Sequence, residues 1–85
     1  MNRWIGEVSG LPSQSVTIEI FRTNVQGRAM AEMLIILLSN TFPESKINFD
    51  LEDCDRILRV AGFNLSPQKI IDLLHFNGFQ CEILD

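Results

Sequence analysis

The sequence is poor in the residues that carry most enzyme chemistry. Its 85 residues include two cysteines and one histidine, and no glycine-rich loop could cradle a phosphate group. The histidine has no identifiable nucleophile beside it, and the serines are scattered along the chain. The cysteines, Cys54 and Cys81, are too few for a disulfide framework, so we expect free thiols. These absences predict a protein that is not an enzyme and holds no cofactor.

Basic residues are also scarce, and long apolar runs are missing. Seven lysines and arginines are spread along the chain, and the formal net charge is -4. Scattered cations make no positive patch that could neutralise phosphates, so we expect neither nucleic acid nor a membrane as partner. The longest apolar run, residues 33–38, is far short of the ~20 residues that span a bilayer. Since the N-terminus shows no secretory leader pattern, we expect a cytoplasmic protein.

What is present fits one small domain. Apolar residues make up 46% of the chain and charged residues 21%, which is ordinary for a globular protein. A chain of this length can bury one modest core. Residues 1–14 mix glycine, proline and serine with a few apolar residues and keep no period, so we expect an N-terminal arm. The domain itself is predicted to occupy residues 15–85.

The first half of this domain predicts a strand followed by a helix. Residues 16–21 alternate with a period of two and are rich in β-branched side chains, which is typical of a strand. Its predicted buried side chains are Val16, Ile18 and Ile20, with Phe21 on the other face. Residues 26–40 take a helical period, with Asn24 as the expected N-cap. The predicted buried stripe of this helix consists of Ala29, Met33, Ile36 and Leu37.

The second half predicts a hairpin, a second helix and a last strand. Residues 47–51 and 56–61 alternate as two strands, the second with Leu58 and Val60 facing inward. Ser66-Pro67 opens a helix and Gly78 suits its C-terminal end. The buried stripe of that helix is predicted to be Ile70, Ile71 and Leu74, and a short strand with Cys81 and Ile83 follows. This order predicts an α+β fold, the ferredoxin-like βαββαβ plait, with a four-stranded antiparallel sheet and both helices on one face.

Three stretches of the chain occur in an order and spacing shared with a known family. They are the first strand with its turn into a helix, the hairpin of residues 47–60, and the pair Ser66-Pro67-Gln68-Lys69-Ile70-Ile71 and Asn77-Gly78-Phe79. From about Val16 to Leu84 the chain thereby resembles the heavy-metal-associated domain of copper chaperones and metal-transporting ATPases. The resemblance implies the same plait fold.

The resemblance also implies where a metal site would lie. The family binds soft ions through a Met-x-Cys-x-x-Cys loop between the first strand and the first helix, where the helix N-terminus stabilises the thiolates. The matching positions in this sequence are Asn24, Gln26 and Ala29, and none of them can supply a thiolate. We therefore expect a module with the family's frame that has lost its metal site.

Two other metal sites are open as alternatives. Cys54, His75 and Cys81 have suitable ligand types, although the predicted fold puts the two cysteines toward opposite edges of a sheet whose strands are ~4.8 Å apart. The acidic cluster is either a hard-cation site or a solvated hairpin tip, and the lack of a glycine there favours the tip. Its members are Asp50, Glu52, Asp53 and Asp55.

The predicted fold leaves two apolar surfaces uncovered. On the sheet face away from the helices, the candidate anchors are Phe21, Ile57 and Leu84. On the outer side of the first helix, the candidates are Leu34, Ile35 and Leu38, and the N-terminal arm is the simplest cover for them. We therefore expect a small interaction or regulatory module that binds a protein partner or self-associates.

Overall fold

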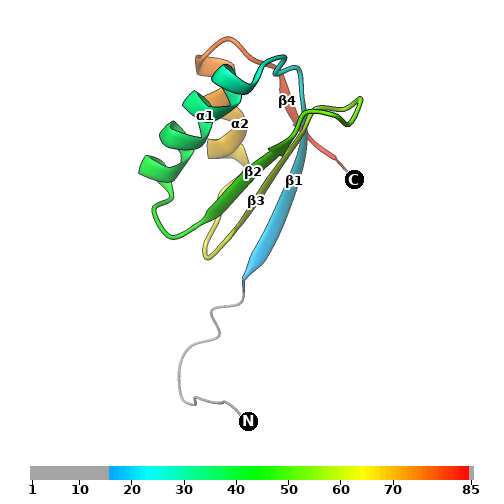
Figure 1. The fold of residues 1–85 in the computed structure, drawn as a ribbon. Helices are drawn as coiled ribbons and strands as arrows, with labels where there is room; N and C mark the ends of the chain where they lie inside the picture. Colours follow the sequence, from blue (N-terminus) through cyan, green and yellow to red (C-terminus); the bar gives the residue numbers. More distant parts are fainter. Residues whose placement is uncertain (1–15, 85) are drawn as a thin grey trace, which may run out of the picture.

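The structure, a computed structural model, describes residues 16–84. Its elements follow the predicted order: β1 (Thr17–Thr23), α1 (Arg28–Thr41), β2 (Lys46–Asp50), β3 (Ile57–Gly62), α2 (Pro67–Phe76) and β4 (Cys81–Ile83). The strands form one antiparallel sheet in the order β2-β3-β1-β4, and both helices lie over one face of it (Figure 1). The prediction of an α+β fold with a four-stranded antiparallel sheet and two helices is confirmed. The predicted arm, residues 1–14, lies outside the described residues.

The buried face of strand β1 is the opposite of the one predicted from the sequence. Phe21 is paired with Leu58 of β3, and both side chains are fully buried, whereas Ile18 is 61% exposed. The prediction that Phe21 anchors a partner is therefore wrong. Both faces of this strand carry large apolar residues, so the alternation alone could not choose between them. Because paired residues in a sheet share a face, the register with β3 makes the choice.

The buried face of helix α1 also differs from the predicted one. Its buried residues are Ala31, Leu34 and Leu38, whereas the predicted stripe residues Ala29, Met33 and Ile36 are exposed and Leu37 is half-buried. Leu34 and Leu38 are thus core residues and were wrongly assigned to the surface, and Ile35 is half-buried. The N-cap is Gly27 rather than Asn24. Six consecutive apolar residues fit several helical stripes, which explains the error.

The second half of the chain agrees better with its sequence pattern. Leu58 and Val60 of β3 are fully buried, as are Ile70 and Leu74 of α2, while Ile71 is half-buried. The Ser66 hydroxyl accepts a hydrogen bond from the Lys69 amide at 3.3 Å and caps α2, with Pro67 as the first helical residue. Gly78 has φ +89°, a conformation that only glycine adopts at low cost.

Ile57 is the last surface candidate that the structure corrects. It is only 5% exposed, although it lies on the sheet face away from the helices. It lies at the start of β3, opposite Asp50 of the neighbouring strand β2, and other open-face residues of β3, such as Arg59, are exposed.

Neither helix within residues 16–84 has the length and hydropathy needed to cross a membrane.

Candidate functional site

The β1–α1 loop is held by hydrogen bonds to two other segments. In the family that the sequence resembles, the metal-binding thiolates lie in this loop. The Asn24 side chain accepts a hydrogen bond from the Gln80 amide at 2.8 Å, so it connects the loop to the residue before β4. The Thr23 hydroxyl donates to the Arg56 carbonyl at 2.6 Å and accepts from the Val25 amide at 3.2 Å. Asn24 therefore fixes the loop instead of capping α1.

The two thiols lie in different environments. Cys54 is exposed in the β2–β3 loop, and Cys81 is buried at the start of β4. Burial, with a smaller contribution from the Glu82 charge, raises the pKa of the Cys81 thiol from 9.0 to about 12. Cys81 is therefore protonated at neutral pH and packs as a small apolar side chain, which is the usual behaviour of a buried free cysteine.

The structure does not bring together the three residues of the alternative metal site. Within residues 16–84, the ligand atoms of three or more His, Cys, Asp or Glu side chains come within 4.8 Å of one another in one group only, formed by Asp53, Cys54 and Asp55. Cys81 and His75 are not part of it, and His75 is exposed in the last turn of α2.

The acidic cluster supports the turn between β2 and β3. The Asp53 carboxylate accepts a hydrogen bond from the Asp55 amide at 2.9 Å, and the Asp50 carboxylate accepts one from the Glu52 amide at 3.3 Å. Asp55 also forms an ion pair with Arg22 of β1 at 3.3 Å. These hydrogen bonds and this ion pair explain why acidic residues occur at a tight turn, and the explanation does not require a bound cation.

The sheet face opposite the helices, which we call the open face, has an apolar half. Ile18 is 61% exposed there, and Val16, just before β1, is 57% exposed. Half-buried neighbours continue the surface on both sides: Ala61 of β3 is paired with Ile18, and the Leu84 amide donates to the Ile20 carbonyl at 2.9 Å. Of the three predicted open-face anchors, only Leu84 keeps a partly exposed side chain in this patch.

The other half of the open face carries charged side chains, and their positive and negative charges nearly cancel. Arg22 forms ion pairs with Asp55 and with Glu82, the latter at 3.1 Å, and Arg59 donates to the Asn48 side chain at 3.4 Å. The register and the ion pairs place three cations and three carboxylates on or beside the open face as a whole, with Lys46 next to Ala61 and so at the apolar half. They are Arg22, Lys46 and Arg59, and Asp50, Asp55 and Glu82.

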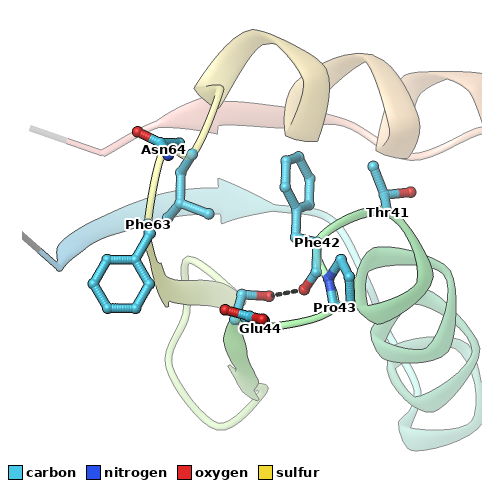
Figure 2. A pocket seen from close by; sticks show the side chains of 8 residues that line it. Thr41, Phe42, Pro43, Glu44, Phe63 and Asn64 are labelled. Atoms are coloured by element: carbon cyan, nitrogen blue, oxygen red, sulfur yellow. Dashed lines mark hydrogen bonds between the residues drawn. The ribbon is translucent and has the colours of Figure 1, made fainter. Parts of the chain in front are cut away.

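A hollow of about 410 Å³ lies between the α1–β2 and β3–α2 loops. Figure 2 shows that the ring of Phe42 points toward α2, whereas the ring of Phe63 points away from it. The Ser45 hydroxyl donates to the Phe42 carbonyl at 2.6 Å, and Glu44 is the one ionisable side chain in the lining. The residues that line this hollow therefore include no pair of ionisable side chains that could act as acid and base in catalysis.

Comparison of the chain with models of known protein families, with curated proteins and with solved structures gave no match. The resemblance to the heavy-metal-associated domain stays a prediction.

Proposed function

We propose that this chain is a small non-enzymatic protein-interaction module that pairs with a second copy of itself through the apolar half of its open face. The observation that carries this proposal is the exposure of Ile18, at 61%, in the middle of a neighbouring set of apolar residues. Apolar patches rimmed by polar residues are the surfaces that proteins use to bind one another.

The balance of charge on the open face supports a second copy as the partner. The chain as a whole carries a net charge of -4, which opposes the approach of two copies in general. The open face, by contrast, has as many cations as carboxylates, and an apolar patch is complementary to itself. A two-fold interface needs such self-complementarity, and two sheets can stack face to face about 10 Å apart.

The proposed frame of this module is the ferredoxin-like βαββαβ plait. The order of elements supports it, since β1 and β3 lie in the centre and each is connected through a helix to an outer strand. The proposal includes a heavy-metal-associated-like ancestry in which the metal loop has lost its function. Asn24, Gln26 and Ala29 supply no thiolate, and Asn24 is engaged with the Gln80 amide.

Sedimentation equilibrium of two lysine variants tests the proposal. Ile18→Lys places a charge in the apolar half, and Ile36→Lys is its matched control, because Ile36 is 62% exposed on α1. Burial of the remaining surface of Ile18 contributes roughly 1–2 kcal/mol per copy, and it occurs twice in a two-fold interface. We therefore expect Ile18→Lys to weaken self-association about 100-fold, and Ile36→Lys to leave it unchanged. A wild type that is monomeric at every concentration contradicts the proposal.

A further inference from the structure

A second hollow, of about 300 Å³, lies between α1 and strand β2. Its apolar lining comes from Ala31 and Ile35 of α1 and from Phe49 and Leu51 of β2 and the turn after it. Ala31 is buried, and the other three are only half-buried, including Phe49, which faces the helix-covered side of the sheet. The core is therefore incompletely closed along this side.

Strand β2 is also an edge of the sheet. It is paired with β3 on one side, and no strand within residues 16–84 is paired with it on the other. Figure 1 shows β2 at the margin of the sheet, with α1 lying over it. Alternate residues of an edge strand direct their N–H and C=O groups outward, where another strand can pair with them.

The rim of this hollow is acidic. Glu32, Asp50 and Glu52 line it together with a single cation, Arg28. Glu32, Asp50 and Glu52 are exposed, and none of them takes part in the ion pairs found among residues 16–84, which join Arg22 to Asp55 and Glu82. A ligand that enters here meets an apolar floor and an excess of negative charge.

We infer that this groove binds an extended segment of a partner protein, which adds a fifth strand to the sheet beside β2. Side chains of a paired strand alternate between the two faces of the sheet. Those on the helix side therefore enter the hollow against Ile35 and Phe49 and are apolar, and those between them lie near Asp50 and are basic. Strand addition supplies affinity through the backbone, and the alternate side chains supply specificity. This site shares only the charged residue Asp50 with the open face, lies away from its apolar half, and does not depend on the proposed self-association.

The test uses the full chain, labelled with ¹⁵N, and a synthetic probe. The probe is a seven-residue peptide of alternating lysine and valine with blocked ends, and its control replaces every lysine by glutamate. We expect the lysine peptide to shift the backbone amide signals of Lys46–Asp50, with weaker binding at higher salt, and the glutamate peptide to have no effect. Two further probes carry N-methyl groups on the valine amides or on the lysine amides. One of these two should lose binding, because only alternate residues of the added strand pair with β2.

Charge-reversal variants locate the site. Asp50→Lys should weaken binding of the lysine peptide roughly fivefold and Glu32→Lys less, because Glu32 lies on the helix side and acts on the lysines only through the charge of the rim, whereas the matched control Glu44→Lys should have no effect. Glu44 is also an exposed acid, and it lies in the other hollow. Ile18→Lys should bind the peptide as the wild type does, which separates this site from the open face.

Four outcomes overturn the inference. The first is an absence of amide shifts in β2 at saturating peptide concentrations, and the second is full binding by both N-methylated probes. The third is an equal loss in Glu44→Lys and Asp50→Lys. The fourth is slow hydrogen exchange of the outward amides of β2 before any peptide is added, since residues 1–15 or a second copy would then occupy the edge.

Discussion

Replacement of Phe21 by alanine tests the facing of β1, on which the open face depends. Phe21 is the largest of the fully buried side chains among the described residues, and its strand neighbours in the register are Leu58 and Ile83. Truncation of a buried phenylalanine costs about 3–5 kcal/mol, from lost transfer free energy and from the cavity that remains. A domain of this size has a total stability of about 5–15 kcal/mol, so Phe21→Ala should be strongly destabilised and Phe21→Leu less so.

The assay is urea unfolding followed by circular dichroism, at a concentration where the chain is monomeric. The matched control is Ile18→Ala, on the same strand but largely exposed. We expect its free energy of unfolding to change by less than about 1 kcal/mol. If Ile18→Ala costs more than Phe21→Ala, then β1 buries its other face and the description of the open face is wrong.

Four further predictions concern the ends of the elements and the thiols. Ser66→Ala should lower the free energy of unfolding by about 1 kcal/mol through loss of the α2 cap. Asn24→Ala removes the acceptor of the Gln80 amide, and because this hydrogen bond is exposed it should cost only about 0.5–1 kcal/mol, measured by the same unfolding assay. Iodoacetamide should modify Cys54 rapidly in the native protein and Cys81 only after unfolding, as read by mass spectrometry. Because the pKa of Cys81 is raised from 9.0 to about 12 on folding, its contribution to stability is complete below pH 9 and is lost as the pH rises from 9 to about 12.

Each of these predictions has a result that contradicts it. Unchanged stability in Ser66→Ala or Asn24→Ala would show that the hydrogen bond in question does not hold its segment. Equal alkylation of the two thiols in the native protein would contradict the burial of Cys81. A Cys81→Ala variant with the same loss of stability between pH 9 and 12 as the wild type would assign that loss to another group.

The order of the elements could be predicted because the sequence marks their ends with residues of fixed conformational preference. Pro43 lies just beyond α1, Ser66-Pro67 opens α2, and Gly78 follows its C-terminal end. The buried stripe of α2 could be predicted as well, because Gln68, Lys69 and Asp72 leave only one apolar face on that helix.

The facing of β1 and α1 could not be predicted from local patterns. Strand β1 offers Ile18 and Ile20 on one face and Phe21 on the other, and residues 33–38 of α1 are apolar all round. In both elements the buried face is chosen by contacts with residues that are distant in sequence, such as the pairing of Phe21 with Leu58. That the sheet face away from the helices binds a partner stays a prediction, and two of its three named anchors, Phe21 and Ile57, are buried.

The central claim is that the apolar half of the open face joins two copies of the chain. The most direct measurement is the self-association constant of Ile18→Lys compared with that of Ile36→Lys, from sedimentation equilibrium. The two residues have the same side chain and nearly the same exposure, 61% and 62%, but lie on opposite layers of the molecule. We predict a wild-type constant for Ile36→Lys and one about 100-fold weaker for Ile18→Lys. Equal constants for the two variants would contradict the claim.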